Sequence, residues 1–265
     1  MNNKLNKLKN KRPDDLKDHH MPQNFDISLK AYGGGGTSKS LNPSPKKLNP
    51  QPMNGFETQY KNIIDYIVRI THTIWEEKNI GYIYDTYSPD CLVWDEFGLQ
   101  YGSEKIVSDT IHTNNAFPDI RLFADEVIWA GDEKTSFHTS HRTIITGTNT
   151  GFSKFSKPTG KTVRLFCIAN CVAKNNEIYY ENVVYDTAGL IKQLGLDLHE
   201  VAKQIANEGV RGPFAPDFKK IKPKRKISKL KPISYEIPNN IKNLREFVHA
   251  VYDTIWNRRN FSALN

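Results

Sequence analysis

The sequence predicts an α+β fold, in which helices pack on a curved antiparallel sheet. Helical spacing of apolar residues governs the chain from Phe56 to about residue 116. Alternating segments of the kind that form strands follow from residue 120 to residue 186. Because helices do not alternate with these later strands, a parallel doubly wound fold is disfavoured.

Composition divides the 265 residues into four segments. Residues 1–54 are low in apolar side chains and rich in glycine and proline, which predicts a disordered basic tail. Residues 55–210 hold the folded domain, and residues 211–238 form a linker rich in proline and lysine. Residues 239–265 predict one further helix.

The net charge of +8 suggests nucleic-acid binding, so its placement matters. Residues 56–210 carry 14 Lys and Arg against 21 Asp and Glu, a balance of −7. The excess of positive charge therefore lies in the flanks. Residues 1–55 carry 10 Lys and Arg against 4 Asp and Glu, and residues 213–235 carry 8 Lys and Arg against 1 Asp. A basic groove on the domain is not supported. The flanks either make weak nucleic-acid contacts or are solvated tails.

The three cysteines, Cys91, Cys167 and Cys171, are odd in number and show no metal-type spacing with histidine. We therefore expect neither a disulfide framework nor a metal site, and a reducing compartment fits best. The N-terminus lacks the apolar core of a signal peptide, and no run approaches membrane-spanning length. The sequence thus predicts a cytoplasmic protein without a membrane segment.

The first half of the domain predicts three helical pieces and one strand. Apolar residues recur three and four apart from Tyr60 to Trp75, which predicts a core-facing helix ending near Asn79. A short helical piece over 82–87 and a strand over 91–94 follow. Ser103 and Glu104 are residue types that favour a helix start, and that helix must end before Pro118.

The second half predicts a meander of four strands joined by turns and one long loop. The predicted strands are Ile120–Asp132, Thr135–Thr146, Thr162–Ala173 and Glu177–Asp186. A short helix follows Asp186, and a polar helix is predicted over 198–208.

Residues 243–265 align without gaps to residues 62–84. The identities are Asn62/Asn243, Thr73/Thr254, Ile74/Ile255, Trp75/Trp256 and Asn79/Asn260. This similarity predicts a second copy of the first helix, which begins a truncated tandem repeat. The alternative is chance similarity between two amphipathic helices.

The stretch ENVVYDTAGLIKQLG changes from strand to helix at Asp186. A carboxylate therefore sits where a strand ends. Either it points into an apolar pocket, or it caps the helix that follows.

Several short motifs occur in a characteristic order along residues 58–196. They are Ala116-Phe117-Pro118-Asp119-Ile120, Gly131-Asp132, GTNTGF from Gly147, PTGK from Pro158, and DTAGLIKQLG from Asp186. The series resembles SnoaL-like polyketide cyclases and their ester cyclase relatives, within the nuclear transport factor 2-like superfamily. The resemblance implies a cone of helices and bent sheet around one apolar pocket, often in a homodimer, and no cofactor.

The resemblance also implies that Asp186 is a general acid/base in an intramolecular aldol closure. Apolar burial would raise the pKa of such a carboxyl group toward neutrality. Two departures weaken the transfer of this activity. The strand 162–173 lacks the histidine of the cyclases, and Asn182 stands where relatives commonly have tryptophan.

Strand alternation predicts further residues of the pocket. It places Tyr180, Asn182 and Asp186 on one face, and Asn170 is the polar residue near the middle of the preceding strand.

His138 and His141 lie three apart and face opposite sides, so only one can enter the pocket, and His138 is the candidate. Arg142 shares the face of His138 and either binds an anionic group or forms a salt bridge. Trp94 and Phe97 are aromatic candidates for the lining, with ordinary core packing as the alternative.

Two hypotheses of function follow. The first is a cofactor-independent cyclase, isomerase or hydrolase that acts on an apolar oxygenated small molecule, with Asp186 as the acid/base. The second is a non-catalytic module that binds a small apolar ligand or assembles through its sheet. A homodimer, or pairing of tandem domains within one chain, is expected in either case.

Overall fold

The computed structural model describes residues 30–31, 50–208 and 244–264. The chain divides into two compact units between Pro216 and Asp217, which are described separately. The predicted linker over 211–238 and most of the predicted tail over 1–54 lie outside the described residues. No helix in the described ranges is long and apolar enough to cross a membrane.

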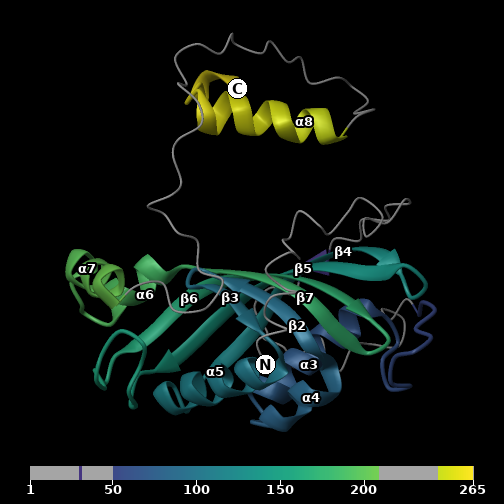
Figure 1. The fold of residues 1–265 in the computed structure, drawn as a ribbon, viewed down its shortest axis with the longest axis horizontal. Coiled ribbons are helices and arrows are strands. Elements are labelled where there is room, and N and C mark those ends of the chain that lie inside the picture. The colour runs from purple at the N-terminus through teal and green to yellow at the C-terminus, as the bar shows by residue number, and fades with distance from the viewer. Residues whose placement is uncertain (1–29, 32–49, 209–243, 265) are drawn as a thin grey trace, which may run out of the picture. The chain divides into compact units, whose positions relative to one another are not determined.

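Seven strands of the first unit form one sheet in the order β1-β4-β5-β6-β7-β2-β3 (Figure 1). They are β1 (Lys30–Ala31), β2 (Tyr87–Asp95), β3 (Gly98–Tyr101), β4 (Arg121–Asp132), β5 (Ser136–Thr148), β6 (Thr162–Lys174) and β7 (Glu177–Tyr185). The four long strands β4 to β7 lie where the alternation predicts them.

The sheet is mixed, which corrects the prediction of a wholly antiparallel one. Strand β2 pairs in parallel with β7, and all other neighbours are antiparallel. Parallel neighbours require a long connection, here the whole segment between β2 and β7. Two short strands are present that the sequence patterns do not predict. Strand β1 lies in the predicted tail and pairs with β4 at Val127, and β3 forms a hairpin with β2.

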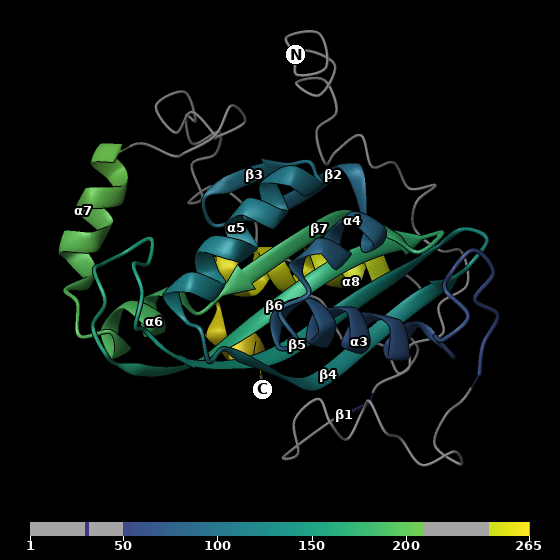
Figure 2. The same cartoon turned by 90° about the horizontal axis from the view of Figure 1, so that it is seen from below.

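Helices cover one face of the sheet, as Figure 2 shows for α3, α4 and α5. The helices of this unit are α3 (Ile63–Trp75), η4 (Ile80–Tyr82), α4 (Ile83–Thr86), α5 (Ser103–Ala116), α6 (Thr187–Gln193) and α7 (Leu198–Glu208). Helix α3 begins where Asn62 accepts a hydrogen bond from the Asp65 backbone N–H at 2.8 Å. The predicted α+β fold class is therefore confirmed.

Two apolar clusters hold helices and sheet together. One joins α3 to β4, β5 and β7 and includes the fully buried Ile63, Tyr66 and Phe137. The other joins the end of α5 to β4, β6 and β7 and includes Phe117 and Leu165. The space between the helices and the concave face of the sheet draws its walls from both clusters.

Strand β7 contains one extra residue, Tyr179, relative to β6. Ala173 pairs with Ile178, whereas the preceding residue of β6 pairs with Tyr180. A bulge of this kind inverts the side-chain alternation along a strand. Ile178 and Glu181 both face the helices as a result, and Val183 continues on the face of Glu181.

The described part of the second unit, residues 244–264, is helical, and its first helix begins at the aligned position. It contains α8 (Leu244–Val251), a π-helical continuation η6 (Tyr252–Asn257) and a turn η7 (Phe261–Leu264). Leu244 is the aligned counterpart of Ile63, the first residue of α3.

The two helices also end alike. Lys78 and Arg259, which are aligned, both adopt the left-handed backbone region with φ of 60° and 53°. The next residue, Asn79 or Asn260, donates its backbone N–H to the carbonyl six residues earlier at 3.0 Å in both cases. The two helices share this ending, and the copy of the first helix and the truncated tandem repeat stay predictions.

Candidate functional site

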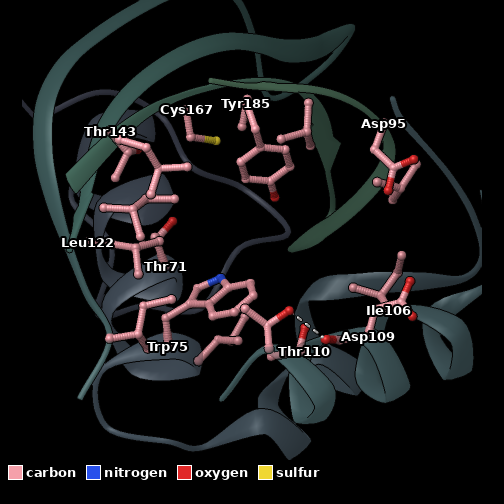
Figure 3. Close-up of a pocket in the computed structure, with 18 of the residues that line it drawn as sticks. Thr71, Trp75, Asp95, Ile106, Asp109, Thr110, Leu122, Thr143, Cys167 and Tyr185 are labelled. Atoms are coloured by element: carbon pink, nitrogen blue, oxygen red, sulfur yellow. Dashed lines mark hydrogen bonds between the residues drawn. The ribbon is translucent and has the colours of Figure 1, made fainter. Parts of the chain in front are cut away.

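A cavity of about 240 Å³ lies between α3, α5 and the concave face of the sheet. Apolar side chains dominate its walls, among them Ile67, Ile70, Leu122, Ile145, Val163 and Leu165. Figure 3 shows Trp75 of α3 facing Thr143, Cys167 and Tyr185 across this space. The cavity agrees with the apolar pocket that the sequence predicts.

Glu181 of β7 is the buried carboxyl group of this cavity, with 8% of its surface exposed. The Tyr87 hydroxyl donates a hydrogen bond to Glu181 Oε2 at 2.9 Å. Burial raises the pKa of Glu181 to about 7, although the hydrogen bonds from Tyr87 and Cys171 act in the opposite direction. Glu181 can therefore take up and release a proton near neutral pH.

Two tyrosines, Tyr87 and Tyr185, supply hydroxyl groups to the lining of this cavity. Burial raises the pKa of Tyr87 and of Tyr185 well above the usual range, so both stay protonated and remain donors. The hydroxyl group of Tyr185 points into the cavity (Figure 3). One hydroxyl group thus positions the carboxyl group of Glu181, and the other faces the space for a ligand.

His141 of β5 lies on another part of the same wall. It pairs with Ala169 of β6, and Glu181 pairs with Cys171 of β6, so one strand separates the two side chains. Strands lie about 4.8 Å apart and these two positions are also offset by two residues along β6, which places the backbones of His141 and Glu181 about 12 Å apart. Burial lowers the pKa of His141 to about 4, so its imidazole is neutral at pH 7.

The opening of the cavity is marked by three solvent-exposed lining residues, Glu96, His112 and Lys154. Phe97, in the turn between β2 and β3, packs against Phe155 with ring centroids 6.3 Å apart. The ammonium group of Lys154 lies 4.6 Å from the centre of the Phe97 ring. The prediction that Phe97 lines the pocket is confirmed.

Asn149 organises the loop that carries Lys154 and Phe155. Its side chain is fully buried, and its amide donates hydrogen bonds to the carbonyls of Ala116 at 3.2 Å and Gly151 at 2.8 Å. Its Oδ1 accepts from the backbone N–H of Thr159 at 2.9 Å and from the Thr159 hydroxyl at 3.1 Å. The loop is thereby attached to the end of α5.

The prediction that Asp186 points into the pocket is wrong. Its side chain is exposed, and Oδ1 accepts a hydrogen bond from the Gly189 backbone N–H at 3.0 Å. It therefore caps α6, which confirms the alternative interpretation. The Cβ of any other residue at position 189 would lie 2.2 Å from Asp186 Oδ2, so glycine is required for this close approach.

Three more predicted residues face away from the cavity, and the bulge at Tyr179 explains this for the two that lie on β7. Tyr180, Asn182 and Asn170 lie on the outer face of the sheet, where the Asn170 amide donates to the Asn182 carbonyl at 3.4 Å. Simple alternation from the apolar Ile178 assigns the inner face to the wrong set of residues beyond the bulge.

The prediction for β5 is half correct. Only one of its two histidines enters the cavity, and it is His141 rather than His138. Arg142 lies on the outer face with His138, and its guanidinium group pairs with Asp125 at 2.6 Å and Glu126 at 3.5 Å. The salt-bridge alternative for Arg142 is therefore confirmed.

Trp94 also faces outward, because its neighbours Val93 and Asp95 line the cavity and adjacent residues on a strand point to opposite faces. The predicted lining role of Trp94 is wrong for this reason.

Glu181, Tyr87 and His141 are site residues that the sequence patterns do not predict. One signal for Glu181 is present, since it is a carboxylate in the middle of a strand whose other residues are mostly tyrosine, valine and isoleucine. Nothing local indicates Tyr87, which is 94 residues away along the chain. Within the described ranges, no group of three or more His, Cys, Asp or Glu side chains could hold a metal ion.

No family model matches the chain, and no curated protein matches it. Solved structures do resemble it. A proposed SnoaL-like polyketide cyclase from Jannaschia sp. CCS1 is 13% identical, with a TM-score of 0.47, over 56% of this chain and 99% of its own. IdmH from Streptomyces antibioticus, a proposed polyketide cyclase, is 15% identical, with a TM-score of 0.44, over 50% of this chain and 98% of its own.

A Catenulispora acidiphila protein with a ketosteroid isomerase-like fold, solved with trimethylamine, is 17% identical. Its TM-score is 0.42, over 49% of this chain and 93% of its own. These structural neighbours are SnoaL-like and ketosteroid isomerase-like proteins. At these identities the likeness concerns the fold.

Proposed function

We propose that this chain is a cofactor-independent enzyme of the SnoaL-like cyclase type, and that Glu181 is its general acid/base. One observation carries the proposal. A single carboxyl group is buried in the wall of an apolar cavity, its pKa is raised to about 7, and a tyrosine hydroxyl holds it in place. General bases work best when their pKa lies near the pH of the reaction.

The chemistry proposed is proton transfer beside a carbonyl group. Glu181 in its carboxylate form takes a proton from the carbon next to the carbonyl, so the C–H bond breaks and its electron pair becomes the enolate. The Tyr185 hydroxyl faces the cavity and donates a hydrogen bond to the enolate oxygen. Attack of the enolate carbon on a second carbonyl of the same molecule closes a ring, and Glu181 returns its proton to the new alkoxide. Return of the proton to carbon instead gives isomerisation.

A neutral two-ring ketone, 2-tetralone, tests the first step of this chemistry. In D₂O we expect the protein to accelerate exchange of the ketone's C1 protons, as measured by proton NMR. The protein-dependent rate should rise with pH and level off above about 7, because only the carboxylate form of Glu181 accepts a proton. Exchange by hydroxide alone keeps rising with pH, which separates the two contributions.

If 2-tetralone binds and its protons exchange only at the buffer rate, the enzymatic proposal fails. The chain would then be a non-catalytic module that binds small apolar ligands, the second hypothesis drawn from the sequence. Saturation of ligand-induced NMR shifts in the same samples reports the binding.

We also propose that two copies of the chain associate through the outer face of the sheet. Phe166, Ile168 and Val184 form an apolar patch there, with exposed fractions of 46%, 40% and 59%. Ile168 is at its centre, since it pairs with Val184 on one side and with Arg142 on the other. Exposed apolar patches of this kind mark association surfaces.

Ile168→Glu is expected to shift the protein from dimer to monomer in analytical ultracentrifugation, because the new carboxylate would be buried against its counterpart. Ile111→Glu, which alters an equally exposed isoleucine of α5, is the matched control and should leave the dimer intact. A wild-type protein that sediments as a monomer at micromolar concentration contradicts this proposal.

A further inference from the structure

His141 has a buried polar atom that no neighbour satisfies. The side chain is 2% exposed, and its Nε2 has no hydrogen-bond partner among the described residues. Of the described side chains that line the cavity, it is the one with such an atom. The cavity therefore offers one unused hydrogen-bonding position besides Glu181.

An unpaired polar atom in an apolar interior destabilises the folded protein, so such positions need an explanation. Burial also keeps the imidazole of His141 neutral, so no ion pair offsets the cost of its unpaired nitrogen. A bound molecule that supplies an oxygen to Nε2 would satisfy it. A neutral imidazole can donate or accept this hydrogen bond, so a hydroxyl or a carbonyl oxygen is suitable.

The position of His141 sets the length of such a molecule. His141 and Glu181 lie on strands β5 and β7, with β6 between them. Thr143, Cys167 and Tyr185, which pair across the same three strands, are seen spread across the concave wall in Figure 3. Opposite His141, strand β6 contributes Ala169, whose small side chain leaves room for a ring between the two polar groups.

The charged groups of the cavity limit the charge that a bound molecule can carry. The positively charged lining residue, Lys154, lies exposed at the opening, where its ammonium group contacts Phe97. The buried part of the wall holds the carboxyl group of Glu181 and neutral side chains. A ligand with a carboxylate would find no cation there and would meet the field of Glu181.

We infer that His141 binds an oxygen atom of the substrate at the side of the cavity away from Glu181, and that the substrate is a neutral, ring-sized molecule with an oxygen function at each end. The Glu181 end of this inference rests on the proposed function. His141 is a binding and positioning residue in this arrangement. A ketone or ester fits the cavity, and a free acid does not.

Three probes test the inference. The two-ended probe is 6-acetyl-2-naphthol, and the one-ended probes are 2-acetylnaphthalene and 2-naphthol. Titration calorimetry should show that wild-type protein binds the two-ended probe about tenfold more tightly than the better one-ended probe, which corresponds to one additional hydrogen bond. The anionic 6-hydroxy-2-naphthoate should bind more weakly than all three.

His141→Leu should reduce this tenfold advantage to within about twofold while it leaves the better one-ended probe unaffected. His141→Gln, which retains a hydrogen-bonding group, should preserve part of the advantage. In urea denaturation His141→Leu should be at least as stable as the wild type, because it removes an unsatisfied buried atom.

Two results would overturn the inference. One is equal affinity of wild-type protein for two-ended and one-ended probes. The other is a His141→Leu variant that loses stability and binds every probe equally less well, which would make His141 a purely structural residue. These readouts involve no turnover, so failure of the 2-tetralone exchange leaves them intact, and the reverse also holds.

Discussion

Glu181→Gln is expected to slow the protein-dependent exchange of 2-tetralone protons by about 10²–10⁴-fold. Glutamine keeps the size of the side chain and can still accept the hydrogen bond from the Tyr87 hydroxyl, but it cannot take up a proton at neutral pH. The loss should therefore appear in the rate at saturating ketone, with binding of the ketone little changed. Proton NMR at several ketone concentrations separates the two quantities.

Asp186→Asn is the matched control, because Asp186 is the acid that the sequence alone selects. Its carboxylate caps α6 in solvent, and asparagine is an equally good cap, so the exchange rate should stay within about twofold of the wild type. If Asp186→Asn loses most of the exchange rate and Glu181→Gln keeps it, the catalytic group is Asp186 and not Glu181.

The pH dependence of stability tests whether the pKa of Glu181 is raised in the folded protein. The pKa of Glu181 is raised from 4.5 to about 7 on folding, so the folded state favours the protonated form. This group therefore lowers the free energy of unfolding as pH rises from about 4.5 to about 7. Glutamine removes that decline, so in urea denaturation the variant should become more stable relative to the wild type over this range. An unchanged pH profile would mean that Glu181 has an ordinary pKa.

Asn149→Ala is expected to lower the free energy of unfolding by about 2–4 kcal/mol. The substitution removes two donors and one acceptor from a fully buried position, and it leaves the Ala116 carbonyl and the Thr159 N–H without these partners. A buried polar group left without a partner destabilises the folded protein by more than the net contribution of the lost hydrogen bond. Urea denaturation with an unchanged m-value measures the effect.

The exposed neighbour Asn115 provides the control for this loop. Its side chain lies in solvent, so Asn115→Ala should change stability by no more than about 0.5 kcal/mol. Because the loop also carries Lys154 and Phe155 at the opening, Asn149→Ala should weaken binding of 2-tetralone as well. Equal unfolding midpoints for the two variants would show that Asn149 does not hold the loop.

Local patterns in the sequence were enough to predict most of the elements. Helix α3 follows from apolar residues three and four apart, and α5 from Ser103 at its start and Pro118 after its end. Strands β4 to β7 follow from long alternating runs between turn residues. These signals are contained within about fifteen residues of chain, which is why the α+β class could be predicted without knowledge of tertiary contacts.

Local patterns do not determine which residues form the site, because this depends on which residues pair across the sheet. Tyr179 is inserted opposite β6, and this one residue turns Glu181 inward and leaves Asn182 on the outer face. The sequence of β7 contains the acid but not the direction in which it points, since a register shift of one residue moves every later side chain to the other face. The partner of Glu181, Tyr87, reaches it because β2 lies parallel to β7, a pairing between distant segments. Sequence alone therefore determined that this chain builds a pocket, and the tertiary register determined that its buried acid is Glu181 and not Asp186.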